Sequence, residues 1–64
     1  MPKEREVREV LRRLRREGWI EEHGKGSHVV FRKNGTTISV PTAKKELKVG
    51  TYRSIANNAG WLPE

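Results

Sequence analysis

The dipeptide Asn34-Gly35 constrains this chain more than any other feature, because it separates two short segments rich in Val, Ile, Phe and Thr. Both of its residues accept positive φ angles, and Asn-Gly favours the type I′ turn that joins two antiparallel strands. The flanking residues 27–33 and 36–40 therefore predict a tight β-hairpin. The turn also fixes which residues face each other, so that Phe31 faces Ile38.

The register of the hairpin assigns its side chains to two faces, because successive side chains of a strand point to opposite sides. One face is apolar and is predicted to pack against the rest of the chain; it carries Val29, Phe31, Ile38 and Val40. The other face is mainly polar and is predicted to stay open; it carries His28, Val30, Arg32, Thr37 and Ser39.

The residues before the hairpin predict a helix and a short strand. An apolar stripe at helical spacing runs through residues 3–17 and consists of Val7, Val10, Leu11 and Leu14. Gly18 is suited to end this helix in the left-handed conformation. Residues 19–23 begin with two apolar side chains and predict the first strand.

The residues after the hairpin predict a loop and a second helix. Residues 42–49 form the loop, with Leu47 anchored inward. Thr51 is a suitable N-cap for the helix, and Gly60 is expected to end it. The apolar stripe of this helix consists of Tyr52, Ile55, Ala56 and Ala59. The sequence therefore predicts an α+β fold in the order α-β-β-β-α, a three-stranded antiparallel sheet with two helices on one face.

Length and composition limit what such a chain can be. Its 64 residues fit a single domain, residues 1–64, and a domain of this size buries only about 60 % of its unfolded surface. The chain has no cysteine, and its two histidines are too few for a zinc site without suitably placed carboxylates. We therefore expect no metal and no cofactor. No apolar run approaches the ~20 residues that span a bilayer. The charged N-terminal segment is unlike a signal peptide, so we expect a cytoplasmic protein without membrane contacts.

Basic residues dominate the charge, because fourteen Lys and Arg against eight Asp and Glu give a formal net charge of +6. A positive field of this size favours polyanions, and nucleic acid before an anionic membrane. One basic cluster ends the first helix and consists of Arg12, Arg13, Arg15 and Arg16. It either complements the helix dipole and aids solubility or faces phosphates. A second cluster lies in the predicted loop and consists of Lys44, Lys45 and Lys48.

The segment Lys25-Gly26-Ser27-His28 places a hydroxyl and an imidazole at the start of the second strand, on the predicted open face. Histidine can take and give protons near neutral pH, although a single strand histidine is by default an ordinary exposed residue. Three features favour a functional role. The polar, basic face suits an anionic ligand, and Ser27 and the turn amides can donate hydrogen bonds. The apolar Val30 indicates that a substrate or a partner covers this face.

The position of His23 depends on the turn between the first two strands. A two-residue turn places either His23 or Glu21 opposite His28, depending on where the turn is centred. A three-residue loop places Glu22 there instead. We expect His23 to be an exposed residue at the edge of the turn rather than a second catalytic group.

In order and spacing, the motifs of nearly the whole chain resemble those of the HicA-type mRNA interferase toxins, also described as YcfA-like proteins. After the amphipathic helix they are Gly18-Trp19, Lys25-Gly26-Ser27-His28, Phe31, Val40-Pro41, Leu47-Lys48-Val49-Gly50-Thr51, Arg53-Ser54-Ile55 and Ala59-Gly60. The resemblance implies a fold like that of double-stranded-RNA-binding domains, in agreement with the predicted order of elements. It also implies the toxin of a type II toxin–antitoxin system, an endoribonuclease that cleaves mRNA and is neutralised by a HicB-type antitoxin.

The resemblance assigns the catalytic histidine of the family to His28 and its neighbouring glycine to Gly26. Two departures concern further histidines. Many members carry one directly after the catalytic residue, where this chain has Val29, and some carry one after the Val-Pro pair, where it has Thr42-Ala43. The shared histidine is kept, but the second proton-transfer group is left unassigned.

These observations predict metal-independent cleavage of RNA by attack of a 2′-hydroxyl on the adjacent phosphate, with His28 as general base or general acid. The residues expected to bind the RNA are Lys25, Gly26, Ser27, Arg32, Lys44, Lys45 and Lys48. Among them, Lys25 and Arg32 are expected to stabilise the charge that grows on the phosphate. The antitoxin is expected to contact His28, Val30 and Arg32, and this chain is expected to make no contact with DNA.

Two other functions fit the same sequence. A non-catalytic double-stranded-RNA-binding module has the same order of elements and binds by shape and backbone. The lysines of the predicted loop could serve it, but it has no need of the imidazole of His28. A small protein-interaction module would leave the basic surface without a role, and its RNA affinity would be negligible even at low salt.

Overall fold

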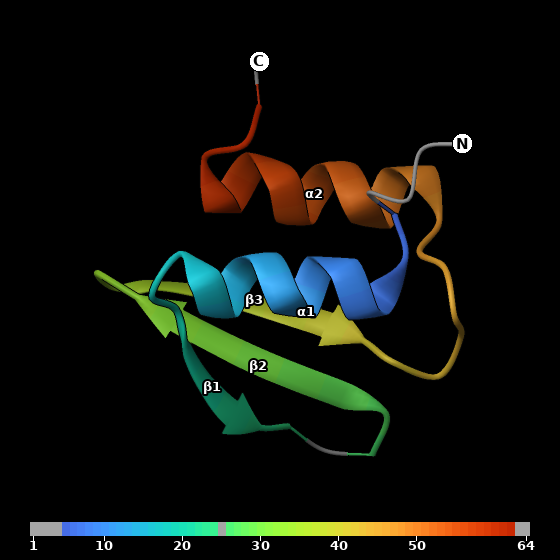
Figure 1. Ribbon diagram of the computed structural model, residues 1–64, viewed down its shortest axis with the longest axis horizontal. Helices are drawn as coiled ribbons and strands as arrows, with labels where there is room; N and C mark the ends of the chain where they lie inside the picture. Colours follow the sequence, from blue (N-terminus) through green and yellow to red (C-terminus); the bar gives the residue numbers. More distant parts are fainter. Residues whose placement is uncertain (1–4, 25, 63–64) are drawn as a thin grey trace.

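The computed structural model describes residues 5–24 and 26–62, apart from the side chain of His23. Five elements follow one another as α1 (Val7–Arg16), β1 (Ile20–His23), β2 (His28–Lys33), β3 (Thr36–Pro41) and α2 (Val49–Ala59). The strands form one antiparallel sheet in the order β1-β2-β3, and both helices pack on the same side of it (Figure 1). The predicted α-β-β-β-α fold class is therefore confirmed. No helix within the described residues is long and apolar enough to cross a membrane.

The hairpin between β2 and β3 has the predicted turn and register. Asn34 has a φ of 51° and Gly35 a φ of 81°, as the type I′ turn requires. The pairing of residues 29–33 with residues 36–40 follows the predicted register throughout. The faces predicted for the two strands are therefore those of the folded chain.

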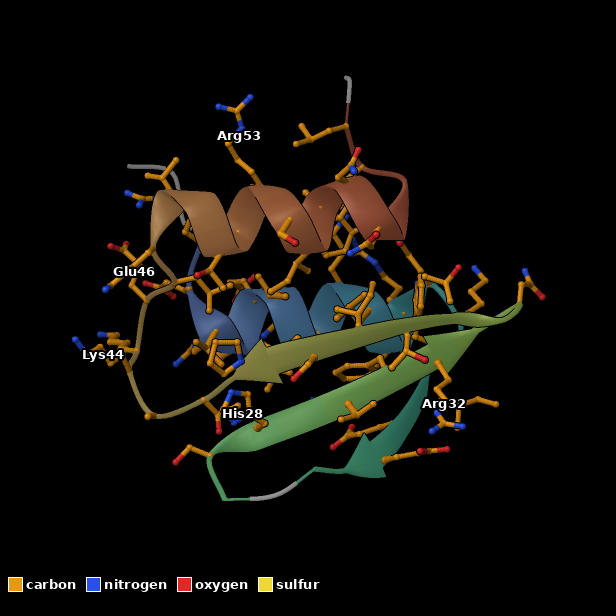
Figure 2. All side chains as sticks on the ribbon, turned by 180° about the vertical axis from the view of Figure 1, so that it is seen from behind. His28, Arg32, Lys44, Glu46 and Arg53 are labelled. Carbon is orange, nitrogen blue, oxygen red and sulfur yellow. The ribbon has the colours of Figure 1, made fainter. Side chains whose placement is uncertain are left out.

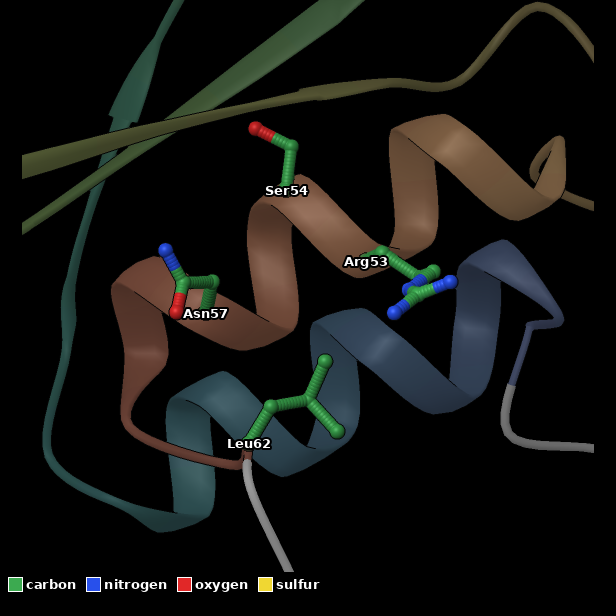
Figure 3. A pocket seen from close by; sticks show the side chains of 4 residues that line it. All are labelled: Arg53, Ser54, Asn57 and Leu62. Atoms are coloured by element: carbon green, nitrogen blue, oxygen red, sulfur yellow. The ribbon is translucent and has the colours of Figure 1, made fainter.

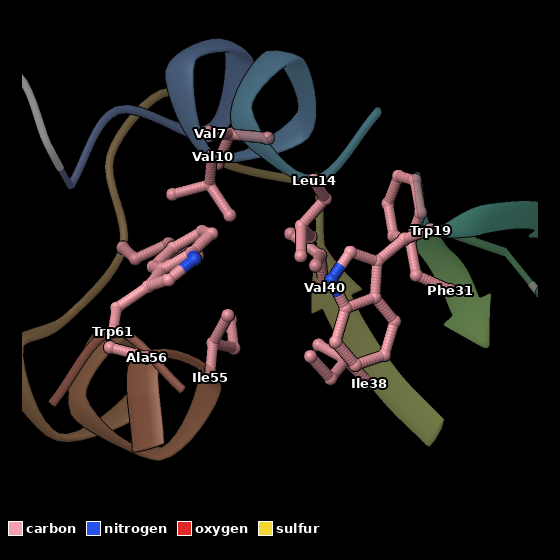
Figure 4. Close-up of a cluster of buried hydrophobic side chains, with 11 residues drawn as sticks. Val7, Val10, Leu14, Trp19, Phe31, Ile38, Val40, Ile55, Ala56 and Trp61 are labelled. Carbon is pink, nitrogen blue, oxygen red and sulfur yellow. The ribbon is translucent and has the colours of Figure 1, made fainter. Parts of the chain in front are cut away.

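The core lies between the sheet and the two helices (Figure 4). Its largest fully buried side chains come from α1 and from the inner face of the hairpin: Val10, Leu14, Phe31, Ile38 and Val40. α2 adds Ile55 and Ala56, and Leu47 anchors the preceding loop as predicted. Burial of a large apolar side chain stabilises a fold by about 1.5–3 kcal/mol. This inner layer therefore holds the domain together and leaves the outer face of the sheet available for function.

α1 begins at Val7, later than the predicted start at the third residue. Glu6 is extended, with φ −69° and ψ 132°, and it forms an isolated bridge with Glu46. The Leu47 N–H donates a hydrogen bond to the Arg5 carbonyl at 2.8 Å. Pairing with a distant segment thus replaces the first predicted helical turn, because tertiary contacts override local helix preference. The first four residues lie outside the described part of the chain.

α2 begins at Val49, and its N-cap is Lys48 rather than the predicted Thr51. Lys48 is extended, with φ −67° and ψ 152°, and caps the helix without a side-chain hydrogen bond. The Tyr52 N–H already donates to the Lys48 carbonyl at 2.9 Å. The buried Leu47 ends the extended segment just before Lys48, so the helix starts at once, and the start expected from the residue type of Thr51 is wrong.

Both helices end as predicted, at a glycine with positive φ. Gly18 has a φ of 88° after α1, and Gly60 has a φ of 81° after α2. The Trp61 N–H then donates to the Ala56 carbonyl at 2.7 Å, which is the long backbone bond of a Schellman motif. This motif returns the chain to the core, where the Trp61 ring is buried.

The Glu17 carboxylate ties the end of α1 to the chain after α2. It accepts hydrogen bonds from Trp61 Nε1 at 2.7 Å and from Arg13 Nε at 3.2 Å. The Arg13 guanidinium also lies 4.1 Å from the centroid of the Trp61 ring. Partial burial acts to raise the pKa of Glu17, but these hydrogen bonds and the nearby positive charges of Arg13 and Lys33 hold that pKa below its ordinary value.

Glu17→Gln should lower the free energy of unfolding by about 1 kcal/mol at pH 7, less than is usual for a charged hydrogen bond because water still reaches the carboxylate. A carboxylate with a pKa lowered by folding stabilises the fold above its unfolded pKa and loses that contribution as the pH falls through the folded pKa. Urea unfolding should therefore show a gap between wild type and variant that narrows as the pH falls from about 5 towards 2. A gap that keeps its size over this range would contradict the role given to Glu17.

Candidate active site

The side chains that point away from the helices form one open face of the sheet. His28 and Arg32, both on this face, are labelled in Figure 2. Its members within the described chain are Ile20 and Glu22 of β1, His28, Val30 and Arg32 of β2, and Thr37 and Ser39 of β3. All are exposed except Val30, which is half-buried. The predicted open face is therefore present.

Backbone contacts hold His28 at the start of β2. It pairs with Pro41 at the end of β3. The carbonyl of the preceding Ser27 accepts two hydrogen bonds from Thr42, one from the N–H at 2.5 Å and one from Oγ1 at 2.7 Å. The imidazole itself is exposed. A ring on a fixed backbone and open to solvent is accessible to a ligand as large as a nucleic-acid strand.

The glycines of the loop before β2 allow β1 to approach His28 closely. A Cβ at Gly24 would lie 2.6 Å from the His28 carbonyl oxygen and 3.2 Å from Val30 Cγ2. Gly26 has a φ of 59°, a conformation that favours glycine. Lys25, which is predicted to bind phosphate, lies outside the described residues.

The register between β1 and β2 differs from all three registers considered for His23. His23 pairs with Val29, one residue beyond His28. The three pairings predicted for His28, with His23, Glu21 or Glu22, are therefore all wrong. Gly24 lies beside His28 instead. Four residues, 24–27, connect β1 to β2, which is more than in any of the turns assumed. The side chain of His23 lies outside the described part of the chain, so its expected exposure stays a prediction.

The observed register brings Glu22 onto the open face beside Arg32. Glu22 pairs with Val30, and its Oε1 lies 3.3 Å from Arg32 Nε. The Arg32 side chain is 62 % exposed and that of Glu22 46 %, so this ion pair contributes only about 0.2–1 kcal/mol. The guanidinium can therefore also bind a phosphate at small cost. Sequence reasoning missed the contact, because alternation along β1 does not fix its register against β2.

The three lysines predicted to bind RNA lie on the segment between β3 and α2. Lys44, Lys45 and Lys48 are all exposed, and the first and last of them line a shallow hollow of about 300 Å³. Figure 2 shows Lys44 at the same end of the sheet as His28, with Arg32 towards the other end. The structure therefore brings Lys44 towards His28 and separates both from Arg32.

Another hollow, of about 530 Å³, lies on α2 (Figure 3). Its lining consists of Arg53, Ser54, Asn57 and Leu62. It holds one cation but neither a carboxylate nor an imidazole, so it offers no groups for proton transfer near neutral pH. Within the described side chains, no three His, Asp or Glu residues are grouped as metal ligands. The open sheet face is therefore the candidate active site.

A comparison with known families identifies the chain. A family model described as HicA toxin of bacterial toxin-antitoxin matches residues 7–61, which include all five elements and the whole open face. The chain belongs to the HicA toxin family. It is thus the toxin of a toxin–antitoxin system, as its motifs predict. No curated protein matches the chain.

Of the residues at the two departures named above, Val29 and Thr42-Ala43, the first two have structural roles. Val29 is partly buried against the core and pairs with Val40. Thr42 binds the Ser27 carbonyl and so joins the end of β3 to the loop before β2. Neither side chain is an acid or base near neutral pH.

Proposed function

We propose that this HicA toxin is an endoribonuclease that cleaves mRNA without a metal ion, and that a HicB-type antitoxin neutralises it. The exposed imidazole of His28, on the open face of a HicA-family sheet, is the observation that supports the proposal most strongly. An imidazole exchanges protons near neutral pH. A module that only bound RNA would have no use for one at this place.

The proposed cleavage uses the reactivity of RNA itself. The 2′-hydroxyl attacks the adjacent phosphorus, the bond to the 5′-oxygen breaks, and the products are a 2′,3′-cyclic phosphate and a 5′-hydroxyl. His28 takes part as a general acid or base, a role that contributes about 10²–10⁴-fold to a rate. Backbone amides at Gly26 and Ser27, together with Lys44, stabilise the charge that develops on the phosphate.

Arg32 serves a neighbouring phosphate rather than the one that is cut. It follows His28 by four residues along β2, a distance of about 13 Å. A single RNA strand that crosses the open face can therefore contact both residues through different phosphates. Lys45 and Lys48 continue the line of basic residues that begins with Arg32 and Lys44, and they extend it towards α2.

The same face suits the antitoxin. Ile20 is 65 % exposed and Val30 is half-buried, so two apolar side chains lie among polar ones. A partner that presents apolar groups to them and acidic groups to Arg32 would cover His28 and exclude RNA.

Removing a positive charge from the open face should weaken RNA binding and reduce its salt dependence. We expect Arg32→Ala and Lys44→Ala each to lower the slope of log K against log salt by about 0.7, the value for one phosphate contact with a single strand. Arg53→Ala is the matched control, because it removes a charge from an exposed position on α2. Anisotropy titrations with a labelled RNA at several salt concentrations measure these slopes. An unchanged slope for both open-face variants would assign the RNA to another surface.

Controlled expression in bacterial cells tests the proposed function as a whole. The wild-type toxin should arrest growth while transcripts acquire new 5′ ends, and the antitoxin encoded beside it should prevent both effects. Growth arrest with intact transcripts would contradict the ribonuclease and favour the non-catalytic double-stranded-RNA-binding module.

A further inference from the structure

Cleavage through His28 needs a second group, because one proton leaves the 2′-hydroxyl while another joins the leaving 5′-oxygen. His28 can perform only one of these transfers in a single step. Val29 packs against the core, and Thr42 is engaged with the Ser27 carbonyl. Among the described residues of the open face, Glu22 is the one carboxylate.

We infer that Glu22 is the general base of the reaction and that His28 is the general acid. This inference rests on the proposed ribonuclease function and adds a catalytic residue to it. Glu22 pairs with Val30, the next residue after His28 on the same face of β2. Residues at such diagonal positions of an antiparallel pair lie about 7–8 Å apart. The Glu22 carboxylate leans towards its other diagonal neighbour, Arg32, which leaves room for a phosphodiester between it and the imidazole.

No large side chain stands up from the sheet between Glu22 and His28 in the described chain. Gly24, which directly follows β1, brings no side chain, and its backbone lies against the His28 carbonyl. Val30 is half-buried and forms the floor of the site. An RNA backbone can therefore lie over Val30 with its 2′-hydroxyl towards Glu22 and its 5′-oxygen towards His28.

Arg32 positions the base. Its Nε lies 3.3 Å from Glu22 Oε1, and the other N–H groups of a guanidinium can reach a phosphate at the same time. Few charged groups surround Glu22 and His28 in the described chain. Arg32 faces Glu22, Lys44 lies at the His28 end of the sheet, and the residues of β3 on this face carry no charge.

Glu22 and His28 together account for both proton transfers of the cleavage step. The Glu22 carboxylate takes the proton of the 2′-hydroxyl as the bond from O2′ to phosphorus forms. The bond from phosphorus to O5′ breaks, and the His28 imidazolium gives its proton to O5′. Glu22 ends protonated and His28 neutral, and exchange with water restores both groups for the next turnover.

Glu22→Gln tests this inference, with Glu21→Gln as the matched control. Glu21 is the adjacent residue of β1, but it pairs with Phe31, and its carboxylate contacts Arg15 of α1 at 2.6 Å, away from the open face. Single-turnover cleavage of a labelled RNA should slow by about 10²-fold or more in Glu22→Gln, with RNA affinity equal to or above that of wild type. The acid limb of the pH–rate profile should also disappear, whereas Glu22→Asp should retain it and Glu21→Gln should match wild type.

Two results would overturn the inference and leave the ribonuclease standing. One is a wild-type rate for Glu22→Gln while His28→Ala is inactive. The other is a change in RNA affinity alone, with the rate and pH profile unchanged, which would make Glu22 only an ion-pair partner of Arg32. Normal cleavage by His28→Ala would instead refute the proposed function itself. Circular dichroism of each variant, compared with Glu21→Gln, separates these outcomes from unfolding.

Discussion

Replacing His28 with alanine should slow RNA cleavage by about 10²–10⁴-fold and leave the domain folded. The loss is large because the imidazole is the proton-transfer group assigned to the leaving oxygen. The fold should survive because the side chain is exposed on the face opposite the core. Single-turnover cleavage of a labelled mRNA fragment measures the rate, and thermal unfolding followed by circular dichroism measures the fold.

Ser39→Ala is the control for this experiment. Ser39 is exposed on the same face, pairs with Val30 across the hairpin, and has no assigned role in the chemistry. It should cleave RNA at close to the wild-type rate. If His28→Ala and Ser39→Ala were equally active, the imidazole would have no part in the reaction.

Replacing Phe31 with alanine should remove a large part of the protein's stability. The Phe31 side chain has no exposed surface, and removal of a buried phenylalanine costs about 3–5 kcal/mol. A domain of this length has a total stability of only about 3–10 kcal/mol, from 0.05–0.15 kcal/mol per residue. Urea unfolding should therefore show a midpoint far below that of wild type.

Ile20→Ala is the matched control for Phe31→Ala, since it also truncates a large apolar side chain of the sheet. Ile20 is 65 % exposed on the open face, so its loss should change the free energy of unfolding by less than about 0.5 kcal/mol. A similar loss of stability in both variants would mean that the core does not lie on the helix side of the sheet. A Phe31→Ala variant with wild-type stability would contradict the packing in the same way.

The hairpin and the faces of its strands could be predicted in detail because the information for them is local. Asn34-Gly35 fixes both the turn and the register, and alternation then assigns Phe31 to the core and His28 to the open face. The helix ends at Gly18 and Gly60 are predictable for the same reason, since a single residue with positive φ closes each one. The position of His28 therefore follows from a few neighbouring residues.

The features that sequence reasoning missed depend on contacts between distant segments. α1 starts late because the residues before it, including Glu6, pair with the segment before α2. The register of β1 depends on how closely Gly24 approaches His28, which no turn rule specifies. The ion pair between Glu22 and Arg32 follows from that register, so this contact could only be found in the folded chain.

The most direct test of a catalytic His28 is the chemistry of the RNA ends. Purified wild type and His28→Ala would be incubated with a structured mRNA in EDTA, and the termini of the fragments would be mapped. We expect wild type alone to cut, leaving 2′,3′-cyclic or 3′-phosphate ends and 5′-hydroxyls, while His28→Ala binds the RNA with similar affinity and leaves it intact. Binding without cleavage by either protein, or equal cleavage by both, would contradict the assignment of His28 as the catalytic residue.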